Sequence, residues 1–280
     1  ILEVLKMKKK ITSIMAATLL LTAVSPSYVT ANAASFETYY YSDLNATICK
    51  AYFDDLISGN IVFFPEEMLE NNEKYPVVVW ANGTFCPPAM YYDLLSQISE
   101  GGYIVVTNTD LFCGNGVSQS LSVDFIINES IDPDSIFYDK VDTEHIGSAG
   151  HSQGGKSAVN SALRDSRIAC VFNIAGNTSL FESRALQVPT FFLAGSSDVL
   201  IYPTLWVRPA YNVCKAPAVY GNIANADHFL CCNSPSIYSE YAINWFDAFL
   251  KNDEEAKAVF RSGGKLFTDS RWKEVSSKNI

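Results

Sequence analysis

The segment Gly150-His151-Ser152-Gln153-Gly154 has the residue types and the spacing of a turn that presents a nucleophilic serine. It follows a strand-like apolar run at 145–149 and precedes a helical pattern at 156–163. A strand can turn this tightly into a helix only if small residues flank the serine at two positions on either side. The pattern predicts that Ser152 stands clear of a sheet at a helix N-terminus, where backbone N–H groups stabilise an oxyanion. The alternative is a plain glycine-rich turn.

A serine hydroxyl becomes a good nucleophile only when a base takes its proton, and His228 is the histidine that we expect to do so. In folds with this turn the chain order is serine, then an acid, then histidine. His228 follows the last predicted strand, at the carboxyl edge of the sheet where ligands collect. His145 lies in the strand before the turn and His151 is the neighbour of Ser152, so we interpret both as packing or supporting residues. The alternative for His228 is a solvated loop histidine.

Asp198 is the predicted acid. It follows the predicted strand at 190–194 through Gly195-Ser196-Ser197, between the serine and the histidine in the chain. Its role would be to accept the Nδ1–H of the base, which fixes the tautomer and stabilises the imidazolium. Asp227 is the rival, but it is adjacent in sequence to His228, and such a neighbour rarely points along the required hydrogen bond.

An oxyanion hole needs two N–H donors, one of which belongs to the residue after the nucleophile, here Gln153. The second comes from the loop after an earlier strand, which in this chain is the loop at 80–86. Gly83 permits a close backbone approach there, so we expect the N–H of Thr84 to be the second donor, with Phe85 as its neighbour. The alternative is an ordinary Asn-Gly turn.

The elements that must position these residues follow an alternating pattern of strands and helices. The chain of 280 residues is 48% hydrophobic and can bury one sizeable core. Apolar strand-like runs lie at 76–80, 103–107, 145–149, 170–175, 190–194 and 219–223, and helical patterns lie at 89–100, 122–128, 156–163 and 236–250. This order predicts an α/β protein with a mostly parallel central sheet flanked by helices. Aromatic-rich runs at 36–41, 48–53 and 61–64 predict an antiparallel edge, and the tail after Glu254 predicts a closing helix and a short return.

Residues 1–33 have the pattern of a leader and a secretory signal peptide. Met7 is followed by Lys8 to Lys10, an apolar run at 11–24, and small residues at 31–33, so we expect cleavage before Ala34 and export. An apolar run of about 14 residues is too short to span a bilayer about 30 Å thick, so no stable membrane anchor is expected. The remaining residues, 34–280, contain no Pro-, Gly- or Ser-rich linker and are predicted to form one catalytic domain.

The net charge of −10 argues against a nucleic-acid partner, because phosphate neutralisation needs clustered Lys and Arg. We expect a secreted, acidic, soluble monomer. The seven cysteines are Cys49, Cys86, Cys113, Cys170, Cys214, Cys231 and Cys232. Export permits disulfides, and the odd number leaves at least one cysteine free. No metal is expected, because the adjacent pair Cys231-Cys232 is not the C-x-x-C spacing typical of zinc sites and the chain has only three histidines.

From residue 75 to about residue 253 the chain resembles the bacterial polyester hydrolases, the cutinase-like and PET-hydrolase-like family of α/β-hydrolases related to dienelactone hydrolases. The resemblance rests on residues 82–84, 101–106, 150–155 and 188–190, on Asp198 and His228, and on residues 244–246 and 251–253. It implies the α/β-hydrolase fold and hydrolysis of carboxylic esters through an acyl-enzyme, with no cofactor.

Three departures from the family pattern bear on the substrate. Thr84 stands where the family has an aromatic oxyanion residue, and Gln153 stands where it usually has methionine; the family's tryptophan clamp is absent from residues 175–178. We therefore expect short to medium aliphatic esters and aliphatic polyesters as substrates, with weak or no action on terephthalate polymers. Phe85 and Phe229 are the candidate substrate-binding residues, and Phe181 is a further aromatic that could replace the clamp.

The resemblance also implies a disulfide from Cys214 to Cys231 or Cys232, because several family members join the same two loops near the catalytic residues. Cys86 and Cys113 each follow strands that should be neighbours, so a second bridge between them is a further prediction. Cys170, inside a buried strand, is expected to be a small apolar thiol.

Two other functions remain open at this point. A peptidase or an acyltransferase could use the same serine, histidine and aspartate, because these residues determine the nucleophile and not the acceptor. A non-catalytic α/β-hydrolase domain could serve as a binding module, although such a module usually loses one of the three residues.

Overall fold

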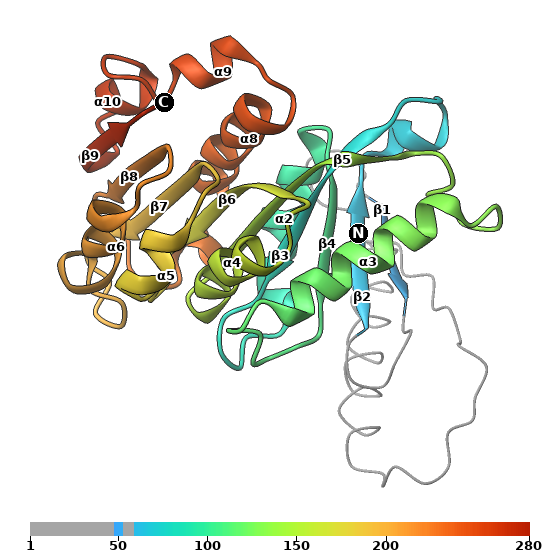
Figure 1. The fold of residues 1–280 in the computed structure, drawn as a ribbon, viewed down its shortest axis with the longest axis horizontal. Helices are drawn as coiled ribbons and strands as arrows, with labels where there is room; N and C mark the ends of the chain where they lie inside the picture. The colour runs from blue at the N-terminus through green and yellow to red at the C-terminus, as the bar shows by residue number, and fades with distance from the viewer. Residues whose placement is uncertain (1–47, 53–58) are drawn as a thin grey trace, which may run out of the picture.

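The computed structural model describes residues 48–52 and 59–280, and in these residues nine strands form a single sheet (Figure 1). The strand order is β1-β2-β4-β3-β5-β6-β7-β8-β9. The strands from β4 to β8 in this order are parallel, whereas β1 pairs with β2, β2 with β4 and β8 with β9 in the antiparallel sense. The predicted mostly parallel sheet and its antiparallel edge are confirmed.

The strands are β1 Ile48–Tyr52, β2 Asn60–Phe64, β3 Tyr75–Ala81, β4 Ile104–Asn108, β5 Val141–His151, β6 Ile168–Ile174, β7 Thr190–Gly195, β8 Ala218–Ile223 and β9 Trp272–Lys278. The helices are α2 Tyr92–Glu100, α3 Val117–Ile131, α4 Gln153–Arg164, α5 Leu180–Ala185, α6 Arg208–Val213, α7 Leu230–Asn233, α8 Ser236–Leu250, α9 Glu254–Ala258 and α10 Lys265–Thr268. Short helical turns lie at Glu66–Leu69, Pro88–Tyr91 and Pro203–Val207.

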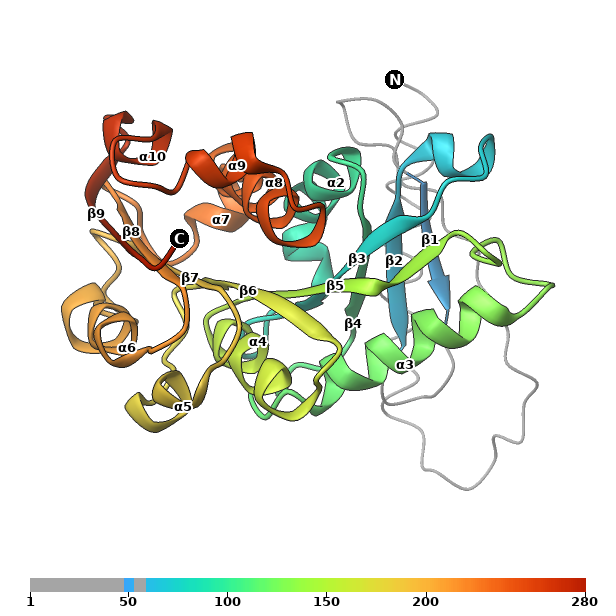
Figure 2. The same cartoon turned by 45° about the horizontal axis from the view of Figure 1, so that its top comes forward.

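Helices cover both faces of the sheet, with α2 and α7 to α10 on one face and α3 to α6 on the other (Figure 2). Strands β3, β4, β7 and β8 are buried along their whole length, which is why they read as continuous apolar runs rather than alternating ones. On the α2/α8 face the core includes Trp80 and Trp245. On the other face, separate clusters form under α3 and under α4 and α6.

Several predicted boundaries differ from the observed ones. The helix expected at 122–128 is α3, which starts at Val117 and ends at Ile131, because polar residues at both ends continue the helix. Helices α5 and α6 are six residues each and too short to show an apolar period, so the sequence pattern missed them. The strand expected at 36–41 lies outside the described residues.

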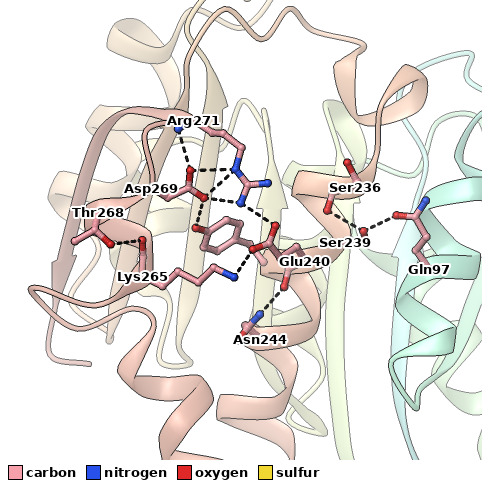
Figure 3. A network of polar contacts seen from close by, with 10 residues as sticks. Gln97, Ser236, Ser239, Glu240, Asn244, Lys265, Thr268, Asp269 and Arg271 are labelled. Atoms are coloured by element: carbon pink, nitrogen blue, oxygen red, sulfur yellow. Dashed lines mark hydrogen bonds and ion pairs between the residues drawn. The ribbon is translucent and has the colours of Figure 1, made fainter.

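The C-terminal segment is attached to α8 by a polar network (Figure 3). Arg271 donates hydrogen bonds to Asp269 and to Glu240 of α8, and Glu240 also pairs with Lys265 at 2.6 Å. The Tyr241 hydroxyl donates to Asp269 at 2.8 Å. Hydrogen bonds from Arg271 lower the pKa of Asp269 to about 2. The network therefore holds α10 and the start of β9 beside α8, so that β9 can close the sheet edge next to β8.

Among the described residues, no helix combines the length and the apolar character that crossing a membrane requires.

The first turn of α4 lies directly against the end of β3. A Cβ atom added to Gly154 would lie 2.0 Å from the carbonyl oxygen of Ala81 and 2.7 Å from that of Asn82. Both neighbours are backbone atoms of a buried segment, so they cannot move aside without shifting β3. A side chain at Gly154 is therefore incompatible with this packing.

We expect Gly154→Ala to lower the free energy of unfolding by about 3 kcal/mol, at the upper end for an overpacked core. Urea denaturation followed by circular dichroism measures this loss. Arg164→Ala, at the exposed end of the same helix, is the control and should change the stability by no more than about 0.5 kcal/mol. Equal effects of the two substitutions would contradict the packing argument.

Candidate active site

Ser152 sits in the turn between β5 and α4 with a backbone conformation that side chains rarely adopt. Its φ is 58° and its ψ is −120°. A non-glycine residue in this region is strained and persists only where the surroundings hold it. The Ser152 N–H donates to the carbonyl oxygen of Ile174 at 2.8 Å, and the Lys156 N–H donates to the Ser152 carbonyl. The turn predicted from the glycine spacing is therefore present, and it projects Ser152 from the carboxyl edge of the sheet.

The three residues predicted from chain order are joined by hydrogen bonds. The Ser152 hydroxyl lies 3.0 Å from Nε2 of His228, and Nδ1 of His228 lies 2.7 Å from Oδ2 of Asp198. His228 follows β8 and Asp198 follows β7, two neighbouring parallel strands whose carboxyl ends meet at the same edge. The rival Asp227 does not contact the ring in this way, because its carboxylate accepts the N–H of Phe229. The geometry selects Asp198 as the partner of His228.

Asp198 is held as a buried carboxylate. Burial alone would raise the pKa of this carboxyl, but its hydrogen bonds to His228 and to the N–H groups of Ile201 and Leu200 outweigh burial and hold the pKa below the usual value. Both backbone N–H groups lie 2.8 Å from Oδ1. One oxygen is thus fixed by the backbone and the other is left to face His228, so the imidazole has a single favoured orientation.

A cavity of about 610 Å³ opens next to Ser152. Both predicted oxyanion residues, Thr84 and Gln153, line it. The N–H of Phe85 donates to the carbonyl oxygen of Leu111 at 3.2 Å, which favours Thr84 over Phe85 as the second donor. The cavity wall is otherwise mostly polar, with Gly114, Asn115, Lys156, Asn160, Asn177, Glu182 and Ile201.

The two predicted substrate-binding aromatics are not among the residues that line this cavity. Phe85 is 69% exposed, and its ring meets that of Phe112 edge-on at 4.7 Å. Phe229 is 38% exposed, and its ring packs edge-on against His228 at 5.1 Å. Both rings therefore lie on the loops that carry the site residues and do not line the polar cavity.

His151 is a supporting residue whose contacts the sequence did not indicate. Its ring is completely buried, and Nε2 lies 2.8 Å from the carbonyl oxygen of His228. Nδ1 lies 2.9 Å from the hydroxyl of Tyr91, which also accepts the N–H of Gly83 at 3.1 Å. One chain of hydrogen bonds thus connects the loop of Thr84, the residue before Ser152 and the backbone of His228. Tyr91 belongs to a short turn 60 residues away in sequence, so no local pattern pairs it with His151.

The predicted disulfides are wrong. Cys86, Cys113, Cys170, Cys214, Cys231 and Cys232 are free thiols. Cys214, at the end of α6, packs in the cluster under α4 and α6, whereas Cys231 packs in the cluster on the α2/α8 face, so the sheet separates them. The Cys113 thiol donates to the carbonyl oxygen of Asn82 instead of meeting Cys86. Cys170 is a buried apolar thiol, as expected.

The fold assembles one group of potential metal ligands within the described residues. Nitrogen and sulfur atoms of His151, Cys231 and Cys232 lie within 4.8 Å of one another. The sequence pattern does not predict this group, because His151 lies in a strand far from Cys231 and Cys232 in the chain.

A family model described as PETase, PET hydrolase-like, matches residues 73–271. The matched span includes Ser152, Asp198 and His228 together with all strands from β3 to β8. No curated protein matches the chain.

Burial keeps the His151 ring neutral and, with the neighbouring His228, lowers its pKa to about 3. In the unfolded chain His151 has a pKa of about 6.5. Between that pH and about 3 the unfolded state therefore binds a proton at His151 that the folded state does not bind. Stability therefore decreases as the pH falls from about 6.5 toward 3. The groups that face the ring are Tyr91, Cys231, Cys232 and His228.

We expect His151→Gln to remove this acid sensitivity, because glutamine does not titrate. Between pH 6.5 and pH 4.5 the natural protein should lose about 2 kcal/mol more unfolding free energy than the variant. Urea unfolding at several pH values in metal-free buffer measures the difference, and carboxylates elsewhere affect both proteins alike. Parallel stability curves for the two proteins would contradict a buried neutral histidine.

Proposed function

Because the chain belongs to the PET hydrolase-like family, whose members are ester hydrolases with the α/β fold, we propose that it cleaves carboxylic esters with Ser152 as the nucleophile. The observation that carries the proposal is the continuous chain of hydrogen bonds from Ser152 through His228 to Asp198, at 3.0 Å and 2.7 Å. This arrangement allows a proton to leave the serine hydroxyl as its oxygen attacks.

The reaction would proceed in two halves. Ser152 Oγ attacks the ester carbonyl carbon while Nε2 of His228 takes the hydroxyl proton, and the carbonyl oxygen becomes an oxyanion. When the tetrahedral intermediate collapses, His228 gives that proton to the leaving alkoxide, which departs as an alcohol and leaves the acyl group on Ser152. Water then attacks the acyl-enzyme with His228 again as the base, and the acid is released with Ser152 restored.

The oxyanion would be held by backbone donors. The N–H of Gln153 begins α4, so the helix dipole reinforces it, and Thr84, whose N–H would be the second donor, also lines the cavity. Because both donors are main-chain groups, the replacement of the family's usual side chains at these positions does not remove them. Ester chemistry is thus compatible with threonine and glutamine at positions 84 and 153.

Aliphatic esters and aliphatic polyesters fit the cavity better than terephthalate. An aromatic acid gains from flat apolar or aromatic walls, but the lining here offers asparagine amides and the ion pair of Lys156 with Glu182, whose charged atoms are 3.6 Å apart. The asparagine amide N–H groups and the Lys156 ammonium can donate to the carbonyl oxygens of neighbouring ester units in an aliphatic chain. Ile201 is the single aliphatic side chain in the wall.

We also propose that the enzyme acts outside the cell. The signal-peptide pattern of residues 7–33 supports export, and these residues lie outside the described part of the chain.

Ser152→Ala should abolish hydrolysis of p-nitrophenyl esters, with a loss in kcat on the order of 10⁶, while circular dichroism stays unchanged. The variant should also lose labelling by a fluorophosphonate probe, which reports an activated serine. Ser166→Ala, at an exposed turn, is the control and should keep full activity and labelling. Activity near the natural level in Ser152→Ala would disprove the mechanism, and a natural protein that neither hydrolyses nor labels would indicate a binding module.

Product release from polycaprolactone should exceed that from amorphous PET film at equal enzyme concentration. Each well-placed aromatic partner contributes about 0.5–1.5 kcal/mol to binding an aromatic ring, and the cavity wall has none. Chromatography of the released acids compares the two films, and a set of p-nitrophenyl esters of increasing length gives the acyl preference. Faster release from PET would contradict this assignment, and Phe181→Ala would then test whether that 83% exposed ring acts as a clamp.

A further inference from the structure

The hydroxyl of Tyr91 lies where three loops of the proposed active site meet, and the proposed mechanism does not use it. It accepts the N–H of Gly83, in the loop after β3, at 3.1 Å, and it lies 2.9 Å from Nδ1 of His151, at the end of β5. Nε2 of His151 in turn lies 2.8 Å from the carbonyl oxygen of His228, in the loop after β8. These three strand ends carry the proposed oxyanion donor, the nucleophile and the base, so one side chain connects all three.

The hydrogen bonds of this chain run in one direction. A carbonyl oxygen can only accept, so Nε2 of His151 carries the ring proton and Nδ1 has the lone pair. The Tyr91 hydroxyl must therefore donate to Nδ1 while its oxygen accepts from Gly83. Burial raises the pKa of Tyr91, and burial together with His228 lowers the pKa of His151 to about 3. Both groups are therefore neutral at neutral pH, and each keeps its role in the chain.

Packing holds the Tyr91 hydroxyl in this position. Tyr91 ends a short helical turn that two consecutive prolines begin, and its completely buried ring packs against Trp80 with centroids 5.1 Å apart. A Cβ atom on Gly83 would lie 3.0 Å from the hydroxyl oxygen, so glycine there permits the close approach. The hydroxyl also contacts the thiols of Cys86 and Cys232 and so fills the space between these thiols and the imidazole.

The loop after β3 is held on both sides of Thr84. Before it, the N–H of Gly83 is bound by Tyr91, and after it the N–H of Phe85 is bound by the carbonyl oxygen of Leu111 at 3.2 Å. The N–H of Thr84 is the proposed second oxyanion donor, and a misplacement of about 1 Å at a reacting centre can cost on the order of 10²-fold in rate. The hydrogen bond to Tyr91 therefore helps to determine how well this donor works.

We propose that Tyr91 is a positioning residue for ester hydrolysis, which holds the second oxyanion donor and the base in register through its bonds to Gly83 and His151. This inference rests on the proposed function, and Tyr91 itself does not touch the reacting atoms. The tetrahedral intermediates of both half-reactions place their oxyanion in the same hole. Loss of the hydroxyl should therefore slow both steps together.

Tyr91→Phe removes the hydroxyl and keeps the ring. Hydrolysis of p-nitrophenyl butyrate should lose about 10–100-fold in kcat with little change in KM, because the Thr84 N–H is displaced rather than absent. Removal of an oxyanion donor costs more, about 10²–10³-fold. The kcat is counted per serine labelled at saturation by a fluorophosphonate probe, so that a partly unfolded sample is not mistaken for a slow enzyme.

Tyr103→Phe is the matched control. Tyr103 is also completely buried, and its hydroxyl donates to Asp247 at 2.6 Å, but it directly precedes β4, at the opposite edge of the sheet from Ser152. Both substitutions remove the hydrogen bonds of a buried hydroxyl and should lower Tm, whereas only Tyr91→Phe should lower kcat. An equal loss of kcat in the two variants, or a natural kcat in Tyr91→Phe, would overturn the inference.

Histidine NMR tests the hydrogen-bond chain without any substrate. The protein has three histidines, so ¹⁵N-histidine labelling gives three ring systems, and His151→Gln identifies the signals of His151. At neutral pH the natural protein should carry the His151 proton on Nε2, and Tyr91→Phe should shift the Nδ1 resonance. A proton on Nδ1 would overturn the inference even in an active esterase. The expected tautomer without any ester hydrolysis would instead overturn the proposed function, and the positioning role with it.

Discussion

The contact between the first turn of α4 and the end of β3 is the constraint on which the site depends. With no side chain at Gly154, the helix backbone lies against the carbonyl oxygens of Ala81 and Asn82. This contact brings the start of α4 to the loop that follows β3, so Gln153 and Thr84 border one cavity. It also forces Ser152 into its strained conformation, because the chain must reverse from β5 into the helix within a single residue. The strain at Ser152, the placement of its side chain and the position of the proposed oxyanion donors therefore have one origin.

Much of the site could be predicted from the sequence because strand ends determine it. In a parallel sheet the carboxyl ends of neighbouring strands meet at one edge, so the loops after β5, β7 and β8 had to converge. The order of Ser152, Asp198 and His228 in the chain then sufficed to assign the three positions, and Asp198 was preferred over Asp227 on local geometry alone. The helices were less predictable, since six-residue helices such as α5 and α6 have no measurable period.

The thiols show what the sequence pattern leaves open. The resemblance implies that Cys214 and Cys231 lie in loops near the catalytic residues, but the sequence pattern does not say on which face of the sheet each side chain packs. Cys214, at the end of α6, packs on the α4/α6 face of the sheet, and Cys231 packs on the α2/α8 face. A bond between them would therefore have to cross the sheet. The contact of His151 with Tyr91 could not be predicted from the sequence either, because it depends on where a turn 60 residues earlier in the chain packs.

The buried histidine also has an electrostatic consequence for the proposed mechanism. The rings of His151 and His228 are 4.6 Å apart, and in the mechanism His228 becomes an imidazolium when it takes the serine proton. A second positive charge at that distance would oppose this step, most strongly in a buried and poorly solvated site. Burial prevents it by keeping His151 neutral, so the Asp198 carboxylate acts on His228 without a competing cation. The pH sensitivity of folding that this burial creates therefore accompanies an uncharged ring beside the proposed base.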